Sequence, residues 1–199
     1  MLSFARFFGE KMKMQRCFLG YALLAILLFG VSCSRLFDNN FANGQKDPSW
    51  QAQKVPDVAL TALDGSKFYL SEYKDQVVLL HFWASWCAPC LEEFPSLLTL
   101  VDSFAGKVVL LAISTDDEKS SIDNFLSGYK KKYKKSFEQN FVRIAWDPAM
   151  EISLNKFNVV HLPETIILDP NLLMVRKIAG QAKWNAAEMK SYLSDLFAK

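Results

Sequence analysis

The chain has 199 residues, with 23 Lys or Arg, 21 Asp or Glu and a formal net charge of +2. Residues 1–33 contain four of the basic side chains and one of the acidic ones, so the remainder, with 19 basic and 20 acidic side chains, is close to neutral. This length suits one domain of ordinary size and a leader. Because nucleic-acid binding needs a strongly basic surface, the near-neutral remainder excludes nucleic acid as an expected partner.

Residues 17–32 form an apolar stretch of 16 residues without a charged side chain. Basic residues precede it and the small Ser32 stands directly before Cys33, an order typical of a secretory signal. The ending Gly-Val-Ser-Cys resembles a bacterial lipoprotein processing site, which predicts cleavage before Cys33 and lipidation of Cys33. An uncleaved membrane anchor is an alternative, although about 17–25 apolar residues are needed to span a bilayer. Secretion without lipidation or an anchor is a third alternative.

All three alternatives place the body of the protein outside the cytoplasm, on the periplasmic side of a membrane, and the first two keep it membrane-associated. The sequence divides into a signal-like leader at 1–33, a flexible tether at 34–52 and a folded domain at 53–199. The tether is assigned because its Asn, Asp, Gln, Gly and Pro residues show neither helical nor strand periodicity.

The folded domain alternates between strand and helix signals, which predicts a single α/β domain. Strands are expected near residues 57–62 and 67–70 around an Asp64-Gly65 turn, at 77–84, 108–113 and 142–146, and in a hairpin over 165–168 and 172–178. Helices are expected over 91–105, from a capping box at Ser120 and Asp123 into residues 130–135, over 149–157, and from Asn185, capped with Glu188, through Leu196. A polar connection is expected over 71–75. The continuous apolar run at 77–84 predicts a strand that is buried on both faces and has parallel neighbours.

Cys87 and Cys90 are the only cysteines of the body, and they lie where the buried strand ends and a helix begins. The unpaired N–H groups and positive dipole of a helix N-terminus stabilise a thiolate there, so Cys87 is the predicted exposed nucleophile. Cys90, one turn deeper, is placed to attack a mixed disulfide on Cys87 and release the partner. A metal site is the alternative, but it would need His81 and His161 to complete a set of four ligands.

The segment Phe-Trp-Ala-Ser-Trp-Cys-Ala-Pro-Cys, residues 82–90, resembles the active-site segment of thioredoxins. More narrowly, it resembles membrane-tethered, extracytoplasmic thiol–disulfide oxidoreductases of the TlpA/ResA type. The segments at 55–73, 92–95 and 161–165 are similar to the N-terminal hairpin, the C-x-x-E-x-P continuation and the cis-proline loop of that family. Over residues 53–199 the resemblance implies a thioredoxin-like α/β fold. Its features are a mixed central sheet flanked by helices, an N-terminal β-hairpin and a central insertion.

The resemblance also implies roles for individual residues. Glu93 occupies the acidic position beside the cysteine pair, where it is expected to accept or supply a proton. Trp86, Leu162 and Pro163 are expected to bind substrate, with Leu162-Pro163 as a cis peptide. Trp86 as a core residue is the alternative. Pro95 is expected to interrupt and kink its helix.

Two features depart from the family pattern. His81 stands where thioredoxin has a buried Asp, and we expect a hydrogen-bonded core histidine there. The long central segment contains a run of lysines at 130–135, for which a solvated helix face is expected over an acidic partner or an anionic lipid surface.

The expected activity is thiol–disulfide exchange, with the Cys87/Cys90 disulfide in place of a cofactor and no metal. The resemblance favours reduction of a cysteine-containing protein substrate, for example the heme-binding cysteines of apocytochrome c, by a monomer that receives electrons from an upstream thiol donor. A thiol peroxidase is an alternative, but peroxidases of this fold have Thr at the position of Ala84. A copper-binding chaperone is another, but thioredoxin-fold copper proteins use a wider C-x-x-x-C pair.

Overall fold

A computed structural model of the chain describes residues 52–198. The leader predicted at 1–33 and the lipidation site at Cys33 lie outside these residues, as does the tether predicted at 34–52 except for its last residue. Over the described range, every helix is too short or too polar to cross a bilayer.

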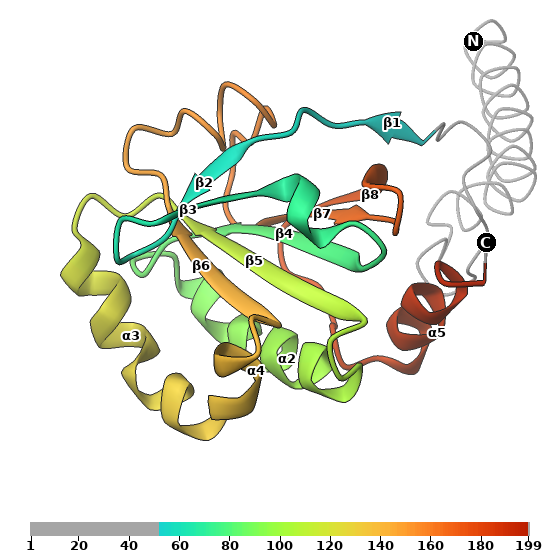
Figure 1. Cartoon of the computed structure of the whole chain (residues 1–199). Helices are drawn as coiled ribbons and strands as arrows, with labels where there is room; N and C mark the ends of the chain where they lie inside the picture. The colour runs from blue at the N-terminus through green and yellow to red at the C-terminus, as the bar shows by residue number, and fades with distance from the viewer. Residues whose placement is uncertain (1–51, 199) are drawn as a thin grey trace, which may run out of the picture. The chain divides into compact units, whose positions relative to one another are not determined.

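A six-stranded mixed sheet forms the centre of the domain, in the order β1-β8-β7-β4-β5-β6 (Figure 1). Its strands are β1 (Gln53–Lys54), β4 (Val77–Trp83), β5 (Val108–Ser114), β6 (Val142–Trp146), β7 (Glu164–Leu168) and β8 (Leu173–Ala179). Strand β4 pairs parallel with β5 and antiparallel with β7, so the prediction of parallel neighbours holds on one side only. All seven residues of β4 and of β5 are buried, as their continuous apolar sequence predicts.

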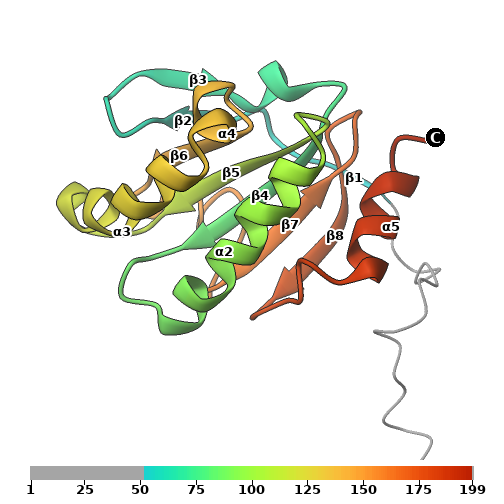
Figure 2. The ribbon, with the colours of Figure 1, turned by 90° about the horizontal axis from the view of Figure 1, so that it is seen from below.

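The two faces of the sheet bury different layers, as Figures 1 and 2 show. Leu79 of β4 faces a core formed with α2 (Ala88–Ser103), α3 (Lys119–Lys132) and α5 (Ala187–Asp195), beside which lies the short α4 (Lys134–Glu138). Leu80, its neighbour, faces a second core formed with the hairpin of β2 (Ala59–Thr61) and β3 (Lys67–Tyr69). Successive side chains of a strand point to opposite faces, so one buried strand contributes to both cores.

The thioredoxin-like architecture expected from the sequence is confirmed, with its N-terminal hairpin and its additional helices between β5 and β6. Helix α2 continues through Pro95 without interruption, contrary to expectation. The polar connection expected over 71–75 is in part a 3₁₀ helix, Leu70–Tyr73, with Leu70 and Tyr73 buried.

Both predicted helix caps are wrong. Helix α3 begins at Lys119, one residue before the expected cap, so Ser120 lies inside the helix and its hydroxyl is 3.5 Å from Glu118 Oε2. Helix α5 begins at Ala187, with Ala186 rather than Asn185 as its N-cap. The predicted helix into residues 130–135 ends at Lys132 and resumes as α4.

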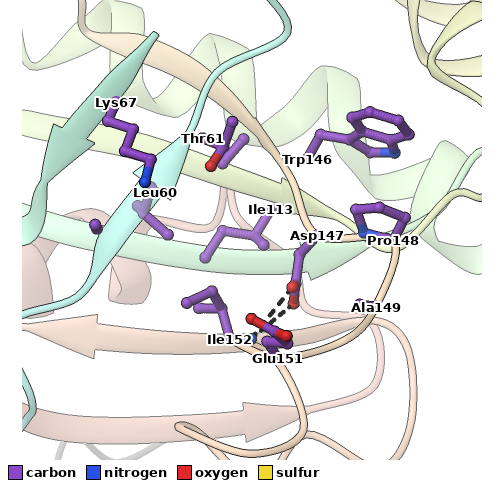
Figure 3. Close-up of a pocket in the computed structure, with 12 residues that line it drawn as sticks. Leu60, Thr61, Lys67, Ile113, Trp146, Asp147, Pro148, Ala149, Glu151 and Ile152 are labelled. Atoms are coloured by element: carbon purple, nitrogen blue, oxygen red, sulfur yellow. Dashed lines mark hydrogen bonds between the residues drawn. The ribbon is translucent and has the colours of Figure 1, made fainter. Parts of the chain in front are cut away.

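The helix expected over 149–157 is a series of turns. Met150 and Asn158 have positive φ values of 55° and 50°, which end right-handed helical geometry at both ends of the segment. The buried Asp147 carboxylate replaces a helical cap by accepting hydrogen bonds from the N–H groups of Ile152 and Ser153. These turns and β2 enclose a hollow of about 350 Å³, in which Thr61, Lys67 and Glu151 are lining residues (Figure 3).

Gly106 ends the α2–β5 connection in a conformation that requires glycine. Its φ is +90°, and an added Cβ would collide with the Phe141 ring. We predict that Gly106→Ala lowers the free energy of unfolding by about 1–3 kcal/mol in chemical denaturation, because the strained φ and the collision both penalise the folded state.

Gly128 supplies the matched control. It lies inside α3 with nothing within 4 Å of an added Cβ, so Gly128→Ala should raise stability by up to about 1 kcal/mol. Equal effects of the two substitutions would contradict this account of the connection.

Candidate active site

Cys87 and Cys90 form a disulfide at the start of α2, with their Cα atoms 5.3 Å apart. Cys87 is the N-cap of the helix and has extended backbone, and Pro89 lies in the first turn, where its missing N–H costs no helical hydrogen bond. Cys87 is 6% exposed, whereas Cys90 is completely buried. Cys87 is therefore the more exposed residue of the pair.

Trp86 is 70% exposed, the largest exposed fraction among the large hydrophobic residues of the described chain. The alternative that Trp86 is a core residue is therefore wrong. An exposed indole directly before the more accessible cysteine offers apolar contact area to an approaching chain.

The peptide bond between Leu162 and Pro163 is cis, as the resemblance implies. Glu164 pairs with Phe82 of β4, so continuing this antiparallel register places Pro163 opposite Trp83, at the end of the strand that leads to the cysteines. Leu162 is half-buried and packs against the core cluster that includes Cys87 and Cys90. The loop that contains Leu162 and Pro163 and the disulfide thus lie at the same edge of the sheet.

Glu93 is buried one turn after Cys90 on the same helix, and only 4% of its surface is exposed. Its Oε2 atom accepts hydrogen bonds of 2.9 Å from the N–H of Ala182 and from Nε1 of Trp184. Burial raises the pKa of Glu93 above its ordinary value of 4.5, while these two donors act in the opposite direction. A carboxyl group with a raised pKa holds its proton to higher pH than an exposed carboxyl group does.

His81 lies behind Glu93, fully buried in β4. Its Nδ1 atom is 2.9 Å from Thr165 Oγ1 and 3.8 Å from Glu93 Oε1. Within residues 52–198, neither His81 Nε2 nor Glu93 Oε1 has a hydrogen-bond partner. His81 is thus a hydrogen-bonded core histidine, as expected, and it is also adjacent to the acidic residue of the site.

The candidate metal-ligating side chains of residues 52–198 lie at most in pairs. In the part of the chain that the structure describes, no group of three or more His, Cys, Asp or Glu side chains is placed to hold a metal ion. His161 is exposed, whereas His81 is buried.

The lysine run lies on α3 and α4, and its members are all exposed: Lys130, Lys131, Lys132, Lys134 and Lys135. Lys130 pairs with Asp123 at 3.0 Å and Lys134 pairs with Glu138 at 3.6 Å. These contacts agree with the expected solvated helix face.

This geometry can perform one kind of chemistry directly. Thiol–disulfide exchange needs a nucleophilic thiol, a resolving thiol and a proton acceptor, and a more exposed cysteine at a helix N-terminus, a buried second cysteine and a buried carboxyl group are groups of these kinds. The AhpC/TSA family description matches residues 52–177, well over half of the chain. The chain belongs to the AhpC/TSA family.

This AhpC/TSA protein is similar to the thiol-disulfide oxidoreductase ResA of Bacillus cereus. The two sequences are 26% identical over 175 residues, which cover 87% of this chain and 93% of ResA. A Chlorobium tepidum structure assigned as the thiol:disulfide interchange protein DsbE has a TM-score of 0.61 at 23% identity, over 74% of this chain and 98% of that one. The exposed lipoprotein thioredoxin Etrx1 of Streptococcus pneumoniae has a TM-score of 0.55 at 25% identity, over 70% of this chain and 99% of that one. The predicted resemblance to thioredoxin-fold oxidoreductases is confirmed.

Some residues around the site of this AhpC/TSA protein were not predicted. Ala182 and Trp184 hold Glu93 from about 90 positions away, at sequence separations of 89 and 91, and Thr165 reaches His81 across 84 positions. No local spacing links such residues, so only the fold reveals these contacts. Asp116, two residues after the end of β5, was not predicted either, although a polar residue at the end of a parallel strand is a common site signal.

Burial lowers the pKa of His81 from 6.5 to about 3. We predict that its ring stays neutral from about pH 5 to pH 8, which ¹⁵N shifts of the imidazole would show. As pH falls, His81 takes up a proton in the unfolded chain before it does so in the folded protein. The contribution of His81 to the free energy of unfolding is therefore lost as pH falls from about 6.5 toward 3.

A His161→Gln variant removes the only other imidazole and leaves one signal to assign. Titration of that signal between about pH 5 and pH 7 would contradict the prediction.

Proposed function

We propose that this thiol–disulfide oxidoreductase works outside the cytoplasm and reduces disulfides in protein substrates through Cys87 and Cys90. The observation that carries the proposal is the disulfide at the N-terminus of α2, with Cys87 as its more exposed residue. A redox-active disulfide of this kind performs the chemistry without a further cofactor.

In the reducing direction, the Cys87 thiolate attacks one sulfur of the substrate disulfide. A mixed disulfide forms, and one substrate thiolate leaves and takes up a proton. The Cys90 thiol gives its proton to Glu93, and the Cys90 thiolate then attacks the sulfur of Cys87, forming the intramolecular disulfide and releasing the second substrate thiolate. Two electrons pass to the substrate, and an upstream thiol donor must return two to the protein.

The surroundings of the pair support reduction as the direction. Strong disulfide oxidants derive their potential from a stabilised reduced form. Glu93, when ionised, places a negative charge one turn from Cys90 and so disfavours a second negative charge on a thiolate there. A less stable reduced form is a stronger electron donor. The named activity of the relative ResA, a thiol-disulfide oxidoreductase, supports the same class of reaction.

The leader and the site together support a proposal for the location and the partners. We propose cleavage before Cys33 and lipidation of Cys33, with residues 34–52 as a tether between the membrane and a monomeric domain. The similar Etrx1 protein is named as an exposed lipoprotein, which supports this arrangement. The substrate is a cysteine-containing protein, and heme-binding cysteines of apocytochrome c are one example that fits. Trp86 and the half-buried Leu162 provide the surface on which an extended segment of that protein would bind, and the buried Pro163 shapes the loop beside it.

We predict that Cys90→Ser accumulates mixed disulfides between Cys87 and its partners, whereas Cys87→Ser does not. The reason is that Cys87 is reachable and Cys90 is not, so only the first variant retains a thiol that a partner disulfide can meet. Non-reducing gels and mass spectrometry of extracytoplasmic extracts would measure the adducts. Equal trapping by the two variants would reject the assignment of the nucleophile.

We further predict that Glu93→Gln moves the alkaline limb of the pH–rate profile of disulfide exchange to lower pH. The raised pKa of Glu93 means that it holds a proton above its ordinary 4.5 and that, once ionised, its charge opposes the Cys90 thiolate. The amide removes that charge and keeps an oxygen to accept from Ala182 and Trp184.

The exposed neighbour Glu92 supplies the control, because Glu92→Gln removes the same charge from the same helical turn without touching the buried cluster. An unchanged profile for Glu93→Gln, or equal shifts for both variants, would show that Glu93 has no special part in proton transfer.

A further inference from the structure

A second buried carboxylate lies at the end of β5 and contacts the loop before Cys87. Asp116 is 2% exposed, and every group that contacts its carboxylate oxygens in a hydrogen bond is an N–H or O–H donor. The N–H of Ser85 donates to both oxygens, at 3.1 Å to Oδ1 and 2.9 Å to Oδ2. The hydroxyl of Ser85 donates to Oδ1 at 2.5 Å, and the hydroxyl of Ser114 donates to Oδ2 at 2.6 Å. The Asp116 carboxylate thus accepts hydrogen bonds from both the N–H and the hydroxyl of Ser85.

Asp116 is itself held in place from two sides. Its N–H donates to Ser114 Oγ at 3.0 Å, and its carbonyl oxygen accepts from Trp146 Nε1 at 2.7 Å. One residue earlier, the N–H of Thr115 donates to the carbonyl oxygen of Trp83 at 3.0 Å. The ends of β4, β5 and β6 are therefore tied together around this carboxylate, and little freedom remains for it to follow a displaced loop.

The loop that Asp116 contacts ends at the nucleophile. Ser85 precedes Cys87 by two residues, and the N–H of Cys87 donates to the carbonyl oxygen of Ala84 at 3.2 Å, which closes a turn. Ser85 is inside that turn and Trp86 is exposed from it. Fixing Ser85 therefore fixes where the turn delivers Cys87 at the N-terminus of α2.

We propose that Asp116 is a positioning residue for disulfide exchange: by binding the N–H and hydroxyl of Ser85, it holds Cys87 where the helix N-terminus can stabilise its thiolate. The inference rests on the proposed function for its meaning, but it concerns a property of Cys87 that is measured without any substrate.

The negative charge of Asp116 and its hydrogen bonds to Ser85 are expected to change the pKa of the Cys87 thiol in opposite directions. A nearby negative charge disfavours a thiolate, so removing the charge alone would lower the pKa of the Cys87 thiol. Losing the hydrogen bonds to Ser85 would release the turn and weaken the stabilisation by the helix N-terminus, which would raise that pKa. The sign of the shift in Asp116→Asn distinguishes the two effects.

Two carboxylates in the same domain serve as matched controls. Asp117 is the next residue and is exposed, so Asp117→Asn removes a charge at almost the same place without a bond to Ser85. Asp147 is buried at the end of β6, where its carboxylate accepts from two backbone N–H groups and from the Ser153 hydroxyl. Asp147→Asn therefore shows how far the alkylation of Cys87 changes when a buried carboxylate that caps a turn is lost elsewhere in the domain.

The experiment is the pH dependence of alkylation by iodoacetamide of the reduced full-length protein, followed at Cys87 by fragment-ion mass spectrometry. We expect Asp116→Asn to raise the midpoint and to slow alkylation at neutral pH by about three- to tenfold, because one pKa unit changes the thiolate fraction up to tenfold. Asp117→Asn and Asp147→Asn should change the rate by less than about twofold. If Asp116→Asn does not fold, Ser85→Ala, which removes the hydroxyl donor alone, should still slow alkylation in the same direction.

A midpoint that is unchanged or lower in Asp116→Asn overturns the proposal, as does an equal rise in Asp147→Asn. Where only Ser85→Ala folds, an unchanged rate in that variant overturns it. Because no protein disulfide takes part in this measurement, failure of the proposed reductase activity would leave the result for Asp116 interpretable by itself.

Discussion

The burial of β4 on both faces is the constraint on which the site depends. A strand with no exposed face cannot shift without uncovering two cores, so its end is a fixed point in the domain. The chain leaves that point through one short turn and enters α2, which places Cys87 as the helix N-cap. The accessible sulfur is therefore positioned by the packing of the sheet, and its reactivity by the helix that follows.

Asp116, His81 and Glu93 are three of the buried polar side chains near this end of the sheet, and they differ in how completely their polar atoms are hydrogen-bonded. Asp116 receives a donor at every contact, whereas His81 and Glu93 each keep a ring or carboxyl atom without a partner in residues 52–198. A buried unsatisfied polar atom costs about 1–3 kcal/mol, so it persists where function requires it. This division fits a fixed role for Asp116 and a proton-exchanging role for Glu93, whose environment favours the protonated form.

The elements that the sequence predicted best were those dominated by apolar periodicity. The runs at 77–84 and 108–113 became β4 and β5 almost residue for residue, and the C-x-x-C spacing located the disulfide. Helix starts were predicted less well, because Ser120 and Asn185 have the right chemistry for caps but the connections from β5 and β8 fix the first turn elsewhere. Contacts such as Asp116 to Ser85 join residues 31 positions apart, and no local pattern encodes them.

A reducing couple formed by Cys87 and Cys90 must have a low reduction potential. This potential is measured by equilibrating the full-length protein with a series of glutathione or dithiothreitol redox buffers. We expect a potential near that of thioredoxin, about −270 mV, and well below that of the oxidant DsbA, about −120 mV. A potential close to −120 mV would mean that the reduced form is the stabilised one, and it would contradict the assignment of this protein as a reductant.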